Sequence, residues 1–348
     1  MNPVLDQIKF MSKIVGLGRV LSMRKKHAEG LKYVRGYVAT TCFWSLLNNG
    51  LLDEIREKGS VEIKDFAERR GLALGALGSI CEYLDGIKVI RYMHGRCSLV
   101  PGGKTLLEEP RGLFDLLYGY EPVLREIENL LKREKTYGKD VWRRGDAVAR
   151  GSGELGRQFP FLAVRELVFS NGFRRVLDIG CGDLEFLFLL CERPDIACFG
   201  IDNDARALEC AQRRLKQSDL RDRITVTLGD MFEVEDVATR FRGIDAITAI
   251  DVFHEYLLAG PDKVIDLLSA FRRHFPEAHL VVAEFFKLPH KWLRRIPTVT
   301  LEHHLLHALT NQVILPIGEW IEVFEKSGYR IVEKKLIHAI GHGYFVLK

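Results

Sequence analysis

Short apolar runs alternate with helix-length amphipathic stretches through the second half of the chain. Five of these runs are strand-like in length and composition, namely RRVLDIG, ACFGID, ITVTLGD, IDAITAID and HLVVAEF. Strands that alternate with helical stretches predict an α/β fold, a doubly wound Rossmann-like sheet of mainly parallel strands. In such sheets the ligand binds at the carboxyl ends of the strands. The residues that end these runs are therefore the first candidates for a binding site.

The first half of the chain has a different, mostly helical pattern. Residues 37–55 and 60–90 predict three successive helices, and RYMHGRCSLV predicts two short strands around a turn. This order is typical of a winged helix. We expect residues 1–165 to form a helical, winged-helix-like domain and residues 166–348 to form the ligand-binding domain.

The third predicted helix decides between DNA binding and a protein contact. Its sequence, GALGSICEYLDGIKVI, contains no Arg, Asn or Gln suited to base edges. Its apolar content favours dimerisation, so we do not expect a nucleic-acid partner.

Composition and charge describe an ordinary globular protein. The 348 residues are 47% hydrophobic and 28% charged, which is enough chain for two domains. Residues 1–40 hold eight Lys or Arg against two acidic residues, a pattern that we interpret as the solvated face of a packing helix. We expect no membrane span and no signal peptide, and the seven cysteines without a CxxC pair indicate free thiols in the cytoplasm.

A histidine-rich segment, TVTLEHHLLHALTNQ, predicts a helix over residues 298–312. At about 3.6 residues per turn, His304 and His307 share one polar ridge of that helix. An apolar stripe runs beside the ridge. His303 is the third histidine of the segment.

The strand ends carry glycines and acidic residues. Gly180 and Gly182 in VLDIGCGDLEFLF allow a tight turn and a close approach to a ligand. Glu185 stands where a diphosphate-binding loop has a third glycine, and neighbouring acids would repel a diphosphate but attract an ammonium group. At the next strand ends, Asp202 is suited to ribose hydroxyls and Asp230 to an adenine amino group.

These segments resemble the S-adenosylmethionine (SAM) motifs of class I methyltransferases. With the helical first half, the chain is similar to the small-molecule O-methyltransferases that dimerise through an N-terminal winged-helix domain. The resemblance implies SAM as cofactor, a small-molecule acceptor, a role in secondary metabolism and a homodimer. It also implies that the first domain covers the substrate and that residues 166–348 bind SAM.

The resemblance carries individual roles to this sequence. His254, in DAITAIDVFHEYL, falls at the position of the general base, next to Glu255 as a second catalytic residue. The cofactor-binding residues implied are Asp178, Gly180, Gly182, Asp202, Asn203, Asp230, Met231 and Asp251. Two positions depart from the family pattern: Glu255-Tyr256 replaces Asp-Trp, and Ile250 replaces a frequent Lys.

Two acceptor chemistries remain open at this point. His254 can take a proton from a hydroxyl that is then methylated. Alternatively, His254 and His304, or His303 or His307 in its place, can bind a divalent metal such as iron together with Glu255 or Asp251. The second arrangement resembles the α-keto-acid C-methyltransferases. Another class of function, a SAM-responsive winged-helix regulator, and SAM-dependent chemistry other than methyl transfer are further alternatives.

Other polar residues have weaker assignments. Arg143, Arg144 and Arg157 flank a Gly-rich segment and are candidates for holding a substrate carboxylate. His338 and His342 are interpreted as part of a closing antiparallel hairpin rather than of the site.

Overall fold

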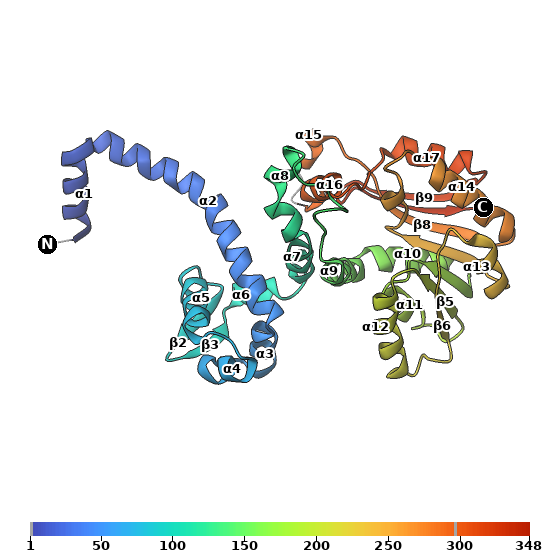
Figure 1. Ribbon diagram of the computed structural model, residues 1–348, viewed down its shortest axis with the longest axis horizontal. Coiled ribbons are helices and arrows are strands. Elements are labelled where there is room, and N and C mark those ends of the chain that lie inside the picture. Colours follow the sequence, from blue (N-terminus) through green and yellow to red (C-terminus); the bar gives the residue numbers. More distant parts are fainter. Residues whose placement is uncertain (1–2, 296–297) are drawn as a thin grey trace. The chain divides into compact units, whose positions relative to one another are not determined.

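The computed structural model describes residues 3–295 and 298–348, and the chain divides into two compact units between Phe114 and Asp115 (Figure 1). The sequence had suggested a boundary at residue 165. Residues 115–165 belong to the second unit because α10 (Pro160–Ser170) buries Val164 and Val168 in the core of the second unit.

The first unit is mainly helical. A three-stranded antiparallel sheet lies within it in the order β1-β3-β2, and the two strands expected in residues 91–100 form β2 and β3. Its core is built on fully buried side chains such as Leu51, Phe66 and Leu84. The elements are α1 (Pro3–Val15), α2 (Leu17–Asn48), α3 (Leu51–Lys58), β1 (Ser60–Glu62), α4 (Ile63–Arg70), α5 (Leu74–Gly86), β2 (Ile90–Met93), β3 (Arg96–Leu99) and α6 (Pro101–Leu106).

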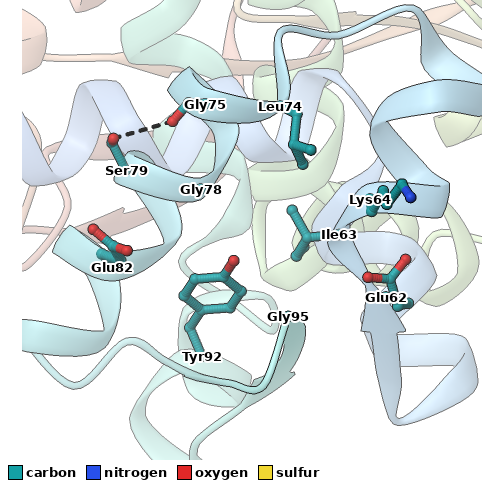
Figure 2. Close-up of a pocket in the computed structure, with 10 residues that line it drawn as sticks. All are labelled: Glu62, Ile63, Lys64, Leu74, Gly75, Gly78, Ser79, Glu82, Tyr92 and Gly95. Atoms are coloured by element: carbon teal, nitrogen blue, oxygen red, sulfur yellow. Dashed lines mark hydrogen bonds between the residues drawn. The ribbon is translucent and has the colours of Figure 1, made fainter.

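Figure 2 shows a shallow pocket of about 340 Å³ in this unit, lined by residues of β1, α4, α5 and the β2–β3 hairpin. Tyr92 and Glu82 lie on one side of it and Glu62 on the other. The Glu62 carboxylate accepts a hydrogen bond of 2.7 Å from the amide of Asp65, so it caps the start of α4. The Glu62 carboxylate therefore has a structural role in the first unit.

Helices α1 and α2 expose many large apolar side chains. Those with more than half of their surface exposed are Leu5, Phe10, Ile14, Leu17, Leu21, Tyr33, Val34 and Tyr37. Among the helices of the described residues, none has the length and apolar character needed to span a membrane. Large apolar exposure of this kind is typical of a protein contact surface.

The second unit is organised around a seven-stranded sheet in the order β6-β5-β4-β7-β8-β10-β9 (Figure 1). Neighbouring strands from β6 to β8 pair in parallel, and β10 and β9 close the sheet as an antiparallel hairpin. The expected α/β doubly wound fold is confirmed. The strands are β4 (Arg175–Ile179), β5 (Ala197–Asp202), β6 (Ile224–Leu228), β7 (Ala246–Ile250), β8 (His279–Phe285), β9 (Ile331–Ile337) and β10 (His342–Leu347).

Alternate residues of the central strands enter two different cores. Leu177, Ile247 and Val282 face one core, which α13, α14 and α17 cover. Val176 and Val281 face the other, which α10, α11 and α12 cover. Because successive residues of a strand point to opposite faces and both faces are buried, the central strands are continuous apolar runs in the sequence. The covering helices are α11 (Glu185–Leu190), α12 (Ala205–Lys216), α13 (Val234–Arg240), α14 (Asp262–His274) and α17 (Ile317–Lys326).

The remaining helices of this unit lie before the sheet or between its last strands. They are α7 (Arg111–Arg125), which begins at the end of the first unit, α8 (Ile127–Leu131), α9 (Gly145–Gln158), the short helix η1 (Phe253–Tyr256), α15 (His290–Leu293) and α16 (Thr300–Leu309). Helices α7 and α9 approach closely, since a Cβ on Gly119 would lie 2.6 Å from Cγ2 of Val148. The amide of Arg144 also donates to the Gly119 carbonyl at 2.8 Å, which fixes the loop before α9.

Candidate active site

The loop after β4 is shaped by its glycines. Gly180 and Gly182 have φ of 78° and 52°, in the left-handed region that glycine adopts without strain. A Cβ on Gly180 would lie 2.9 Å from Cγ2 of Val252, whereas one on Gly182 would have no atom of the described residues within 4 Å. The loop therefore packs on the turn after β7 on one side and leaves open space on the other.

Two carboxylates hold this loop in place. Asp202, the last residue of β5, accepts hydrogen bonds from the amides of Gly182 at 2.8 Å and Asp204 at 2.9 Å. Asp178 is buried, and it accepts a hydrogen bond of 2.6 Å from the hydroxyl of Thr248. Burial raises the pKa of Asp178 to about 7, although the Thr248 hydrogen bond opposes the shift. Cofactor contacts by these two residues stay predictions.

The residues expected near an adenosine lie after β5 and β6. Asp230 is exposed and accepts a hydrogen bond of 3.0 Å from the amide of Phe232, while Met231 is 93% buried in the core beneath it. Asn203 is exposed and hydrogen-bonds to Tyr256. The Tyr256 ring packs edge-on to Phe232 at 4.9 Å. Two strand ends and η1 thus place polar groups beside aromatic rings.

His254 lies in η1, directly after β7, and Glu284 of β8 controls its position. The Nδ1 of His254 lies 3.0 Å from Oε2 of the fully buried Glu284. The other oxygen of Glu284 accepts the amides of Val252 at 3.0 Å and Phe253 at 2.5 Å, and more weakly the amide of His254 at 3.4 Å. One carboxylate therefore fixes both the backbone turn and the ring, and Nε2 of His254 faces away from it.

The electrostatic environment of His254 suits a proton acceptor. Burial alone would lower its pKa, but the charge and hydrogen bond of Glu284, with the charges of Asp251 and Glu255, outweigh burial. The net effect raises the pKa of His254 above its ordinary value. A buried imidazole with a carboxylate on Nδ1 is the usual arrangement of a general base.

The histidine-rich segment forms α16, and it is His307 that lies beside His254. The two ring centroids are 4.9 Å apart, and Nδ1 of His307 donates to the carbonyl of His303 at 2.8 Å. The His303 ring packs against the His307 ring, with 3.7 Å between centroids and the ring planes tilted by 47°. His304, the histidine favoured from the sequence, lies instead among the charges of Lys287 and His290. The histidine that packs against His307 is His303, and the helical spacing alone does not say which of the three histidines meets η1.

Burial keeps the α16 imidazoles neutral. It lowers the pKa of His307 to about 3, an effect that the neighbouring His254 strengthens. It also lowers the pKa of His303 well below the ordinary value. The Nδ1 of His303 is buried and has no hydrogen-bond partner among the described residues. The site thus combines one histidine that favours a proton with two that do not.

Glu255 connects the site to the loop before α9. Its Oε1 accepts hydrogen bonds from Arg143 at 2.7 Å and from Gln312 at 2.6 Å. Arg143 also donates to the hydroxyl of Tyr120 at 3.3 Å. This arrangement puts a guanidinium group close to His254 through its neighbour in sequence.

The other two candidate arginines are held elsewhere. Arg144 pairs with Glu121 at 2.9 Å and lies 4.2 Å above the Tyr118 ring, so it stabilises α7 and the loop. Arg157 pairs with Glu154 and Glu185, each at 2.7 Å. Of the three, only Arg143 contacts a candidate catalytic residue.

Sequence analysis missed Glu284, Gln312 and His342. Glu284 had a signal, because it is the one charged side chain inside the apolar run HLVVAEF. His342 was assigned to the terminal hairpin, which is where it lies, but its Nε2 is also 2.7 Å from Oδ1 of Asp251. Nothing in the local sequence distinguishes Gln312 from an ordinary loop residue.

The site falls inside a region with a known family match. Residues 172–328, which contain the glycine loop, Asp202, Asp230 and His254, match the family described as a methyltransferase domain. Methyltransferase ungE' of Aspergillus campestris is 25% identical over 319 residues, which cover 87% of this chain and 90% of that protein. The 2-ketoarginine methyltransferase of Streptomyces arginensis is 25% identical over 324 residues, which cover 88% and 90%.

Solved structures share the fold over nearly the whole chain. The mitomycin 7-O-methyltransferase MmcR has a TM-score of 0.69 at 16% identity, covering 94% of this chain and 99% of that one. The dimethyltransferase RosA from Streptomyces davawensis has a TM-score of 0.63 at 19% identity, covering 92% and 98%. These similarities extend to both units of the fold.

The His254–Glu284 pair makes a testable electrostatic prediction. In Glu284→Gln the opposing carboxylate is gone, so burial should lower the pKa of His254 instead of allowing it to rise. The measurement is a histidine NMR titration of ¹³C-labelled protein, with His254→Gln to assign the resonance. An exposed carboxyl variant, Glu325→Gln, is the matched control and should leave the titration unchanged.

The same pair predicts the direction of a stability change with pH. Because the folded pKa of His254 is raised, the pair contributes stability that is fully present below about pH 6.5 and is lost as the pH rises through the folded value. Urea unfolding of Glu284→Gln should lack this contribution. A His254 titration that is the same in Glu284→Gln and wild type would contradict the assignment.

Proposed function

We propose that this chain is a class I SAM-dependent methyltransferase of the small-molecule O-methyltransferase type, as its motifs predict, and that it methylates a small acceptor in natural-product biosynthesis with His254 as the general base. The observation that carries this proposal is the buried Glu284 carboxylate on Nδ1 of His254. It orients the ring and leaves Nε2 for the acceptor. We place the reaction in the cytoplasm.

The strand ends supply the proposed cofactor contacts. Asp202 and Asn203 are suited to ribose hydroxyls, and Asp230 to the adenine amino group, with Met231 beneath it. Gly180 and Gly182 give the methionine part a close backbone approach, and Asp178 and Asp251 add acidic character near its ammonium group. The open space beside Gly182 supports this placement.

Proton transfer is the step that this chain's residues perform. SAM, when bound, would supply an electrophilic methyl group whose bond to the sulfonium breaks during transfer, with S-adenosylhomocysteine as the leaving group. Nε2 of His254 accepts the proton of an acceptor hydroxyl as the new oxygen–carbon bond forms, and Glu284 stabilises the resulting imidazolium. Glu255 holds Arg143 and Gln312 at the same place, where the guanidinium group is suited to an acidic group of the acceptor.

A methyl-transfer assay tests the role of His254 as general base. His254→Gln should reduce transfer of labelled methyl groups from SAM by about 10²–10⁴-fold, because proton transfer to a positioned base contributes rate of that order. Binding of S-adenosylhomocysteine, measured by calorimetry, should stay unchanged. We would screen phenols, other hydroxyl acceptors and α-keto acids in parallel. A His254→Gln variant with full activity on the best acceptor would sink the proposal.

A second candidate, metal-assisted C-methylation of an α-keto acid, is favoured by the paired imidazoles. Nδ1 of His254 is bound to Glu284 and Nδ1 of His307 to a backbone carbonyl, so both rings offer Nε2. Histidine ligands of metals commonly have their second nitrogen fixed in this way. The name of one relative, 2-ketoarginine methyltransferase, agrees with a keto-acid acceptor.

His254 and His307 can supply two of the ligands that such an ion needs. Within residues 3–295 and 298–348, no three His, Cys, Asp or Glu side chains are gathered into a metal site, so a third ligand has to come from a rearranged carboxylate. Glu255 is the nearest in sequence, and it would exchange its bond with Arg143 for this role. A divalent ion, when bound, supplies a Lewis acid that stabilises negative charge on a keto acid.

Metal content separates the two candidates. If the second holds, purified wild-type protein should contain close to one equivalent of iron or another divalent ion, and His254→Ala and His307→Ala should lose it. His304→Ala is the matched control and should keep it. Elemental analysis of untagged protein is the measurement. Equal metal content in all four proteins would show that the ion is not held by this pair.

The exposed helices favour a homodimer. Apolar side chains of α1 and α2 stay exposed in a single chain, and a second copy with the same surface would cover them. The regulator alternative gains no support, because α5 offers no base-reading side chain. The first unit is therefore proposed as a dimerisation domain.

Sedimentation velocity tests the homodimer. Wild type should sediment as a dimer, and Leu17→Asp combined with Leu21→Asp should shift it towards the monomer, since each places a charge in an apolar contact. The control is Leu131→Asp, a 76% exposed leucine on α8. A monomeric wild type at micromolar concentration, or a double variant that remains dimeric, counts against this surface.

A further inference from the structure

Strand β10 brings a buried histidine to the end of β7. His342 is the first residue of β10, and it pairs with Phe285 of β8. Its side chain is fully buried, with Nε2 at 2.7 Å from Oδ1 of Asp251 and Nδ1 at 2.6 Å from the hydroxyl of Tyr344. One ring thus joins a phenol and a carboxylate across the end of the sheet.

The carboxylate partner sets the direction of both hydrogen bonds. Oδ1 of Asp251 accepts, so Nε2 of His342 carries the hydrogen of that bond. Nδ1 then accepts the hydroxyl hydrogen of Tyr344, and this bond selects the tautomer of the ring.

Asp251 is held in an unusual backbone conformation. Its φ of 56° lies in the left-handed region, which few residues other than glycine adopt. Its amide donates to the carbonyl of Ala283 at 2.9 Å. Strained conformations of this kind persist where the surroundings determine them, and they concentrate at functional sites.

The position of Asp251 relates it to the cofactor. Its side chain is 26% exposed, so His342 covers one side of the carboxylate and the other side is open. The next residue, Val252, packs against Gly180 of the loop proposed to hold the methionine part. Asp251 therefore lies one residue before the contact with the glycine loop and three residues before His254.

We propose that His342, oriented by Tyr344, is a positioning residue that directs the Asp251 carboxylate at the ammonium group of the cofactor. The inference rests on the proposed cofactor contact of Asp251 and needs no knowledge of the acceptor. A purely structural His342 would only close the hairpin. The two roles differ in the affinity that a substitution of His342 changes. A positioning role affects the binding of the ammonium group, whereas a structural role affects the whole cofactor equally.

Calorimetry with two ligands makes that distinction. The ligands are S-adenosylhomocysteine and its analogue in which hydrogen replaces the α-amino group. His342→Leu removes the donor to Asp251, so we expect S-adenosylhomocysteine to bind about 10–100-fold more weakly, as for other residues that orient a ligand-binding group. Binding of the deaminated analogue should change by less than about twofold.

Conservative and control variants sharpen the experiment. His342→Gln keeps an N–H donor near the position of Nε2 and should bind both ligands nearly as wild type does. Tyr344→Phe removes only the hydrogen bond that selects the tautomer, so about a twofold to tenfold loss is expected for S-adenosylhomocysteine alone. His338→Leu, on the same hairpin but packed against Phe286 and Trp292, should change neither affinity.

The outcomes separate this inference from the proposed contact of Asp251. Equal weakening of both ligands in His342→Leu, or none in either, overturns the positioning role. Asp251→Asn tests the contact itself: if it leaves both affinities unchanged, the contact fails and the inference with it. If Asp251→Asn removes the preference for the amino group but His342→Leu does not, only the inference fails. Should His342→Leu not fold, Tyr344→Phe against His342→Gln decides by the same comparison.

Discussion

The carboxylate of Glu284 is the group on which the geometry of the catalytic end depends. It is fully buried, and a buried charge is costly unless hydrogen bonds surround it. Three backbone amides of residues 252–254 and Nδ1 of His254 provide those bonds. Removing one partner of such a buried arrangement typically costs about 3–5 kcal/mol, because the remaining charge is left uncompensated. The turn after β7 is therefore held rigidly, and so is the His254 ring that belongs to it.

The same turn links the glycine loop, where we propose that the cofactor binds, to the proposed base. Val252 packs against Gly180, so the loop after β4 and the turn after β7 set each other's position. Asp202 ties the far side of the loop to β5 through the amide of Gly182. On the proposed mechanism, the loop that holds the methyl donor and the His254 ring held by Glu284 are thus fixed relative to each other. Methyl transfer needs this alignment, because orienting the reacting groups supplies much of the rate of a reaction between two bound partners.

The sequence predicted those features that depend on local pattern. Apolar runs gave β4 to β8, of which β4, β7 and β8 are buried on both faces. The strand order of the family placed Asp202, Asp230 and His254 at one edge. Helical spacing could put His304 and His307 on one ridge, but which of them meets η1 depends on where α16 docks. The choice of Arg143 over Arg144 likewise depends on the close packing of α7 and α9. Contacts between residues far apart in the sequence cannot be predicted from the local hydrophobic period.

The three histidines of the site illustrate how one residue type acquires opposite properties. Burial acts on all of them in the same direction, against the charged form. His254 departs from the others because an ionised carboxylate touches it, whereas His307 donates to a neutral carbonyl and has His254 itself as a neighbour. Protonation of His254 makes protonation of His307 still less favourable, since the two rings are 4.9 Å apart. Of the three rings, His254 is therefore the one that the proposed mechanism can use to accept a proton. The neutral ring beside it keeps a lone pair on Nε2 for a hydrogen bond or a metal ion.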